Sequence, residues 1–164
     1  MANNYYMWTL ASIAAMVLGT GASIIVGNPA ITGTSVAASF LLYRQGVKVA
    51  RMKGRTDTSK VLHSLSANLI EFLGLFSAYF FSPAALPVFF AAVAVGFQNS
   101  FHLMLKDRLR SSNVEIIGRQ ERVAILAATL VAGSFNEYIV FYGLLVVGGA
   151  AVVESGRQLF LSLR

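Results

Sequence analysis

The chain has 164 residues, of which 56% are hydrophobic and only 12% are charged. A soluble domain has about 25% charged residues, so this composition excludes an ordinary water-exposed surface and indicates a membrane protein. The net charge is +6, and the lack of cysteine excludes both disulfides and thiolate metal sites.

The first apolar segment covers residues 5–26 and contains no charged residue. A helix needs roughly 20 apolar residues to cross a bilayer, so this segment is long enough. No Lys or Arg precedes it, which argues against a cleaved signal peptide. Asn28-Pro29 ends the run, and a second apolar segment covers residues 30–43, from which a helix can continue to residue 50.

Two further spans follow a polar stretch at residues 44–60. The third covers residues 61–81 and is closed by Ser82-Pro83. The fourth covers residues 84–105, with Pro87 in its first turn, where proline is tolerated. Both segments are therefore predicted to be transmembrane helices.

The last apolar stretch, residues 123–153, is interrupted by Ser134, Asn136 and Glu137. It forms either one overlong helix or two short spans with a tight hairpin at residues 133–138. The distribution of positive charge favours two spans, because all 13 Lys and Arg lie in residues 44–60, in residues 106–122 or in the tail after residue 153. Six spans place these three regions on one side of the membrane, as the positive-inside rule requires.

The sequence thus predicts an all-α protein, a single integral membrane domain over residues 1–164 with about six transmembrane helices. Both termini are expected on the positive side, in the cytosol or the mitochondrial matrix, so the expected membrane is a prokaryotic plasma membrane or the mitochondrial inner membrane. Topology and contact with anionic lipids explain the net charge, and no nucleic-acid partner is expected.

Small residues recur at every fourth position of the first span, at Ala15, Gly19 and Ser23. Such spacing suits the close packing of helices in lipid.

Polar residues inside the predicted spans are candidates for function, because polar groups are costly at membrane depth. In the third span Ser64, Asn68 and Glu71 are spaced to share one helix face. In the fourth span Asn99 and His102 share a face. Their alternative role is hydrogen bonding between helices.

Three short segments resemble parts of the CDP-alcohol phosphotransferase family, six-helix membrane enzymes with the signature D-x2-D-G-x2-A-R-x8-G-x3-D-x3-D. Ala50-Arg51 matches the A-R pair. Residues 62–68, LHSLSAN, are similar to the LDSxxD start of the family's third helix, and residues 118–122, GRQER, resemble the basic segment that opens its fifth helix. In the family, the four aspartates hold the divalent metal that binds the CDP diphosphate, a task suited to hard carboxylate oxygens.

At the four aspartate positions this chain has Tyr43, Gly46, Ser64 and Asn68. Neutral side chains cannot neutralise Mg²⁺ together with a diphosphate, so the resemblance implies a pseudoenzyme without catalytic residues, metal or cofactor. The basic residues Arg51, Lys53, Arg119 and Arg122 remain candidates for binding the phosphate of a lipid headgroup.

Three functions follow from this interpretation. The first is a non-catalytic accessory subunit of a larger membrane complex, which binds lipids and packs against other membrane proteins or against further copies of itself. The second is an active CDP-alcohol phosphotransferase of phospholipid synthesis, with an altered site for Mg²⁺ or Mn²⁺. The third is a small transporter or channel that uses Glu71 and the face of Asn99 and His102.

Overall fold

The computed structural model of the chain describes residues 4–52, 57–105 and 118–162. These residues form six α-helices: α1 (Asn4–Val26), α2 (Pro29–Met52), α3 (Asp57–Phe81), α4 (Ala85–Leu105), α5 (Arg119–Gly133) and α6 (Glu137–Ser162). The predicted all-α architecture is confirmed for this part of the chain, including the break after residue 133 that divides the last apolar stretch into two helices.

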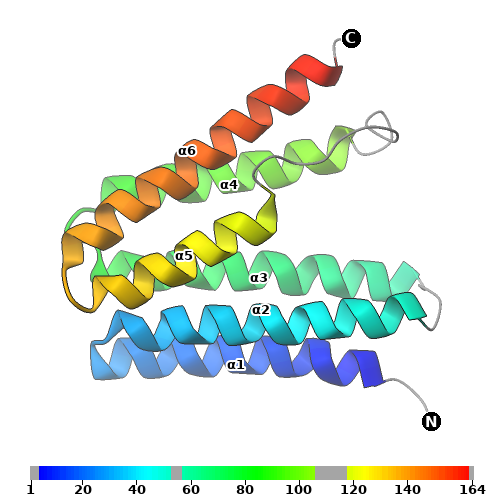
Figure 1. Cartoon of the computed structure of the whole chain (residues 1–164), viewed down its shortest axis with the longest axis horizontal. Coiled ribbons are helices and arrows are strands. Elements are labelled where there is room, and N and C mark those ends of the chain that lie inside the picture. Colours follow the sequence, from blue (N-terminus) through cyan, green and yellow to red (C-terminus); the bar gives the residue numbers. More distant parts are fainter. Residues whose placement is uncertain (1–3, 53–56, 106–117, 163–164) are drawn as a thin grey trace.

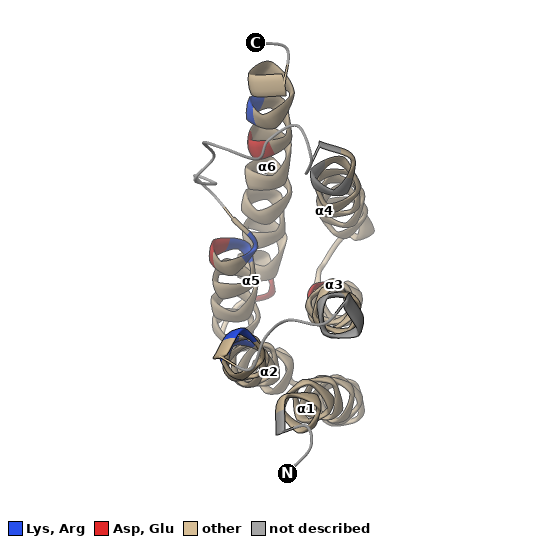
Figure 2. Ribbon diagram, turned by 90° about the vertical axis from the view of Figure 1, so that its right-hand side faces the viewer, with Lys and Arg blue, Asp and Glu red and all other residues tan. Residues whose placement is uncertain are grey.

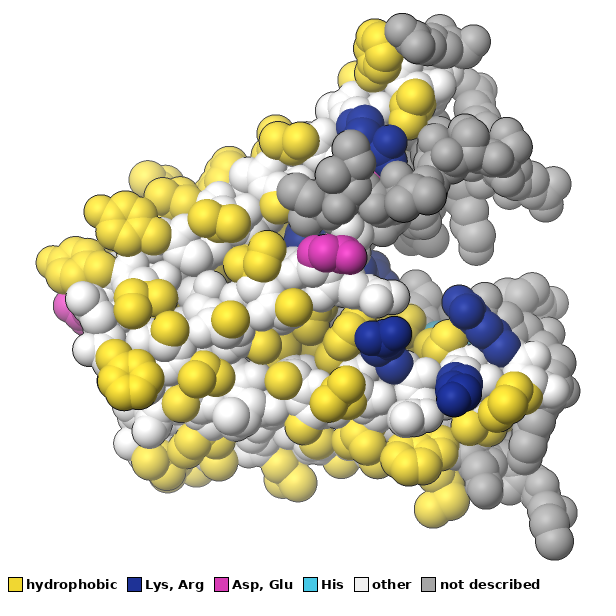
Figure 3. Space-filling model, viewed as in Figure 1, with side chains coloured by type: hydrophobic (Ala, Val, Ile, Leu, Met, Phe, Trp, Pro, Cys, Tyr) yellow, Lys and Arg dark blue, Asp and Glu magenta, His cyan; other side chains and the backbone are white. Residues whose placement is uncertain are grey.

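Successive helices run in opposite directions, so that α1 begins and α6 ends at the same end of the bundle (Figure 1). Seen along the helices, α2, α5 and α6 form one column and α3 and α4 form a second, with α1 below them (Figure 2). The most extensive contacts join α1 with α2 and α4 with α6, whereas α3 and α4 pack less extensively against each other. The Lys and Arg side chains visible in Figure 3 lie toward the end of the bundle where α1 begins (Figures 1 and 3).

The connections at the opposite end are short because their sequences cap the helices. Gly27 has a φ of +72°, which glycine adopts without strain, and its amide donates to the carbonyl of Ser23 to close α1. The Asn28 side chain accepts from the amide of Ala30 at the start of α2, where Pro29 is the first helical residue. The Asn136 side chain caps α6 in the same way, through the amide of Tyr138.

Glycines stand at the crossings between helices. A methyl group placed on Gly33 of α2 would lie 2.7 Å from the carbonyl oxygen of Ala127 and 2.8 Å from the amide nitrogen of Val131, both in α5. These glycines let two helices approach closely, which drives helix association in lipid. Glycines in close contact with a neighbouring helix are found at α1/α2 (Gly19), α2/α5 (Gly33), α3/α5 (Gly74), α5/α6 (Gly143) and α4/α6 (Gly148).

The outer surface is largely apolar. Hydrophobic side chains cover much of the face seen in Figure 3, and residues as large as Phe135 and Leu86 are 88% and 78% exposed. Among the described residues, three helices are long and apolar enough to cross a membrane, over Tyr5–Val26, Val61–Phe81 and Glu137–Ser162, and a shorter apolar helix covers Ala85–Phe101. These helices suggest a membrane-embedded protein and are consistent with a membrane helical bundle.

Helix boundaries differ from the predicted spans mainly on the basic side. Helix α2 ends at Met52, two residues beyond the expected limit at residue 50, whereas α6 continues well beyond residue 153, through Arg157 to Ser162. Apolar runs mark only the part of a helix that suits lipid, whereas backbone hydrogen bonds extend a helix through polar residues as well. Hydropathy therefore underestimated the length of these helices.

Helix α5 begins about halfway along the bundle (Figure 1). Its first residue, Arg119, bonds to Asn68, which lies roughly 16 Å from the start of α3 at a rise of 1.5 Å per residue. Figure 3 shows the molecule indented at this end, between the ends of α6 and α2, with blue side chains near the indentation. The short α5 thus brings the residues of its first turn deep into the bundle.

Candidate functional site

A buried ion pair joins α3 to α5. The guanidinium of Arg122 donates to Oε1 of Glu71 through Nε at 3.0 Å, and its Nη2 lies 2.9 Å from the same oxygen. The side chains are 1% and 3% exposed. Because an unpaired charge is very costly in such surroundings, each group requires the other.

Helix α4 completes the coordination of this pair. Nη1 of Arg122 donates to Oε1 of Gln98, and Nη2 donates to Oδ1 of Asn99 at 3.4 Å. The amide of Asn99 in turn donates to Oε2 of Glu71 at 3.3 Å. Helices α3, α4 and α5 therefore meet at one hydrogen-bonded cluster, which fixes the side chains in the interior.

Arg119, one helical turn before Arg122, forms the outer part of the cluster. Its Nη2 donates to Oδ1 of Asn68 at 2.7 Å, and its Nε lies 3.4 Å from Oε2 of Glu71. The side chain of Arg119 is 28% exposed, so it is the more accessible of the two guanidinium groups. We call the five residues Asn68, Glu71, Asn99, Arg119 and Arg122 the polar cluster.

Matching spacing explains why the polar cluster forms. Asn68 and Glu71 are three residues apart on α3, and Arg119 and Arg122 are three residues apart on α5. Residues three apart share a helix face, so two guanidinium groups meet one carboxylate and one carboxamide. The cluster holds two positive charges and one negative charge, which leaves one positive charge in excess.

A cavity of about 270 Å³ between α3 and α4 reaches the polar cluster. Asn68, Glu71 and Asn99 contribute its polar wall, and Phe72 and Val95 are among its apolar residues. A space with one polar and one apolar wall suits an amphipathic molecule.

The residues at the four aspartate positions of the resemblance do not line one common cavity among those described. Tyr43 and Gly46 both face His63: the rings of Tyr43 and His63 are 5.9 Å apart, edge to face, and a methyl group on Gly46 would lie 3.5 Å from the His63 ring. Ser64 is partly buried on α3. Asn68 belongs to the polar cluster instead.

The other predicted site residues lie apart from the polar cluster or outside the described residues. Arg51 is exposed in the last turn of α2. Lys53 and the side chain of His102 lie outside the part of the chain that the structure describes. Within that part, no three His, Asp or Glu residues are grouped closely enough to hold a metal ion.

A second buried carboxylate lies on α6. Glu154 is 1% exposed, and the Nε of Arg157 lies 3.3 Å from its Oε2. The amide of Gln158 donates to Glu154 at 3.5 Å. These contacts all lie within α6, so they hold no second helix in place.

Sequence reasoning did not place Arg122 and Gln98 in the interior cluster. Arg122 was a candidate for binding a headgroup phosphate at the membrane surface, and Gln98 was one of the polar residues of the fourth span, for which hydrogen bonding between helices was the expected role. The usable signal was the pair of three-residue spacings, N-x-x-E on α3 and R-x-x-R on α5.

Comparison with known protein families, curated proteins and solved structures gives no match to this chain.

Proposed function

We propose that this protein is a non-catalytic integral membrane protein, a pseudoenzyme that resembles the CDP-alcohol phosphotransferases and acts as a lipid-binding accessory subunit of a larger membrane complex. All six helices cross the membrane, and the basic end of the bundle faces the cytosol or the matrix.

The contact between Asn68 and Arg119 is the main support for this proposal. In the resemblance, Asn68 occupies the position of the fourth metal-binding aspartate. Here its carboxamide oxygen accepts a hydrogen bond from Arg119 at 2.7 Å. A guanidinium at this distance repels a divalent cation, so this position favours an anion instead.

The excess positive charge of the polar cluster indicates which anion suits it. Arg119 is partly exposed and bonds to Asn68, which lines a cavity with an apolar wall. Guanidinium groups bind phosphate oxygens strongly, and an apolar wall suits the rest of a lipid. We therefore infer that the ligand of this site is a phosphate-bearing amphiphile.

The same contacts disfavour a transporter that moves protons through Glu71. Both oxygens of Glu71 already accept hydrogen bonds or ion pairs from α4 and α5. A carboxylate held in this way is a structural centre between helices.

Two measurements test the proposal. The tagged protein is purified in mild detergent and analysed on a native gel, with identification of co-purifying proteins; we expect a stable complex. In parallel, the protein is incubated with CDP-diacylglycerol, candidate alcohols and Mg²⁺ or Mn²⁺, and we expect no CMP release above the blank. A monomer without partners contradicts the accessory role, and CMP release establishes the enzyme instead.

A further inference from the structure

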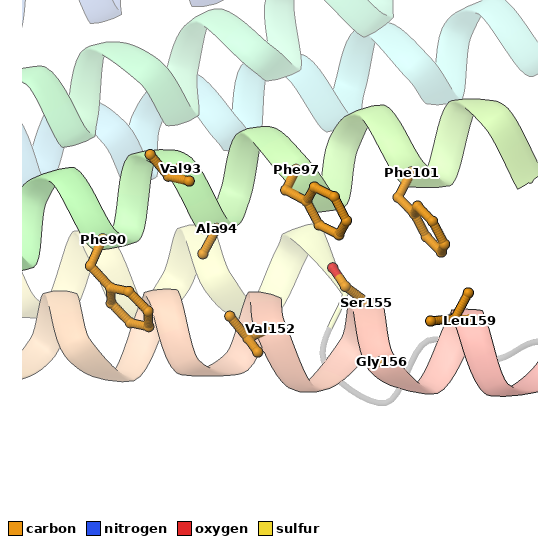
Figure 4. A pocket seen from close by; sticks show the side chains of 9 residues that line it. All are labelled: Phe90, Val93, Ala94, Phe97, Phe101, Val152, Ser155, Gly156 and Leu159. Carbon is orange, nitrogen blue, oxygen red and sulfur yellow. The ribbon is translucent and has the colours of Figure 1, made fainter.

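An apolar groove of about 410 Å³ lies between α4 and α6, away from the polar cluster. Phe90, Phe97 and Phe101 form its α4 wall, and Val152 and Leu159 project from α6 toward them (Figure 4). Gly156 forms part of the α6 wall, and no atom of the described residues lies within 4 Å of a methyl group placed on it. The space in front of Gly156 is therefore open.

An occupant of the groove does not need to supply any hydrogen-bonding group. Its one hydroxyl group belongs to Ser155, which donates to the carbonyl oxygen of Ala151 at 2.8 Å. The remaining lining is aliphatic or aromatic. An apolar chain can fill such a groove without leaving any buried polar group unsatisfied.

The length of the groove matches one lipid chain. Phe90 and Phe101 are separated along α4 by about 16 Å, at a rise of 1.5 Å per residue. One leaflet contributes roughly 15 Å to a hydrocarbon core of about 30 Å. A second helix, with a diameter of about 10–12 Å, is too wide for a groove of this volume.

Charge distinguishes the two ends of the groove. The end at Phe101 and Leu159 faces the end of the bundle where α6 finishes. Arg157, on the turn between Gly156 and Leu159, has a guanidinium that is 25% exposed and that pairs through its Nε with the buried carboxylate of Glu154. Basic residues near a membrane surface attract anionic lipid headgroups.

From these four observations we propose that the α4/α6 groove binds one acyl chain of an anionic phospholipid, whose phosphate lies at the Arg157 end. This inference rests on the proposed membrane-embedded state. It does not rest on the proposed lack of catalysis, which the CMP assay tests separately.

Filling the groove from its open wall tests this site. Gly156→Phe adds a ring where no atom stands within 4 Å, and Gly21→Phe on exposed α1 is the matched control, since Gly21 has equally open surroundings. Each protein is exchanged into detergent with added phosphatidylglycerol, and bound lipid is counted by native mass spectrometry. We expect the wild-type and Gly21→Phe chains to retain one lipid more than Gly156→Phe, in which occupancy of the groove falls by about tenfold or more because the acyl chain loses its apolar contacts. A lipid held at the polar cluster is retained equally by all three proteins.

A second variant keeps the test decisive if the first variant misfolds. Val93→Phe narrows the groove from the α4 side, at a position that is 69% exposed, and decides the question if Gly156→Phe does not give a monodisperse, helical protein. Wild-type retention in both folded variants overturns the site, as does a wild-type protein that retains no lipid. Equal retention of phosphatidylcholine and phosphatidylglycerol contradicts the proposed preference for an anionic headgroup. If the wild-type chain instead retains a helical protein, and the substitutions displace that protein, then the occupant of the groove is not an acyl chain.

Discussion

Arg122 of α5 and Glu71 of α3 form an ion pair at 2.9 Å in the interior of the bundle, where neither side chain is more than 3% exposed. The two residues are 51 positions apart in the sequence. Their contact fixes where α5 begins against α3. It also positions Arg119, the one partly exposed guanidinium of the polar cluster.

Removing one partner of this pair destabilises the protein strongly. Glu71→Leu leaves Arg122 buried without its carboxylate, and we expect a loss of about 3–5 kcal/mol in the free energy of unfolding. Arg122→Leu leaves Glu71 with Arg119 as its remaining cation and is expected to cost less. Titration with a denaturing detergent, followed by circular dichroism, measures both.

The double variant Glu71→Leu/Arg122→Leu separates the pair from its surroundings. We expect it to be more stable than either single variant, because no fully buried charge remains and the guanidinium of Arg119, which is 28% exposed, can be solvated. Glu121→Gln, at an exposed position of the same helix, is the control and is expected to change stability by less than about 0.5 kcal/mol. Strict additivity of the two single effects would show that the pair contributes nothing.

The crossing of α2 and α5 depends on Gly33. Gly33→Ala brings a methyl group to 2.7 Å from a backbone oxygen of α5, and backbone atoms cannot move aside as a flexible side chain can. We expect a loss of about 1–3 kcal/mol, as for other overpacked interiors. The same detergent titration measures it, and Gly21→Ala, with no atom within 4 Å, should leave stability nearly unchanged. Equal effects of the two substitutions would refute the close approach.

The six-span topology predicts which residues share a side of the membrane. The chain has no cysteine, so a single introduced thiol reports its own position. Met52→Cys, at the end of α2, and Phe135→Cys, between α5 and α6, are both exposed positions. In intact cells or sealed vesicles, an impermeant maleimide should label one of them from outside and the other only after permeabilisation. Labelling of both from one side is incompatible with the topology.

Arg119 provides the accessible positive charge of the polar cluster. Arg119→Gln should weaken the preference for anionic over zwitterionic lipid, by an amount corresponding to about 1 kcal/mol per basic residue. The measurement compares thermal unfolding midpoints in phosphatidylglycerol and phosphatidylcholine nanodiscs. Gln120→Ala, on the adjacent exposed residue, is the control. An unchanged difference between the two lipids in Arg119→Gln excludes Arg119 as a phosphate ligand.

Hydropathy and charge were sufficient to predict most of the helices. Asn28-Pro29 and Ser82-Pro83 marked two of the connections, and the placement of Lys and Arg favoured the break after residue 133. The turn residues are a local signal, and the charge distribution requires only the positions of Lys and Arg along the sequence. That each helix crosses the membrane stays a prediction.

The candidate site was only partly predictable. Asn68, Glu71 and Asn99 were selected because polar groups inside apolar spans are costly, and the structure brings them together. Arg122 was expected at the membrane surface, as a candidate ligand of a headgroup phosphate, because a basic residue at the edge of an apolar run is ordinarily solvated. Its burial depends on the start of α5 lying beside the middle of α3, which is a long-range relationship that no local pattern records.

In the proposed six-span topology, the short α5 would also affect the surrounding bilayer. Its 15 residues span about 22 Å, whereas the 26 residues of α6 beside it span about 39 Å. Lipids on the flank of α5 therefore meet a shorter hydrophobic length than lipids elsewhere around the protein. Such mismatch thins the bilayer locally, at a cost of fractions of a kcal/mol per Å. The protein should consequently prefer thinner membranes, and a neighbour that covers this flank would relieve the strain in the lipid.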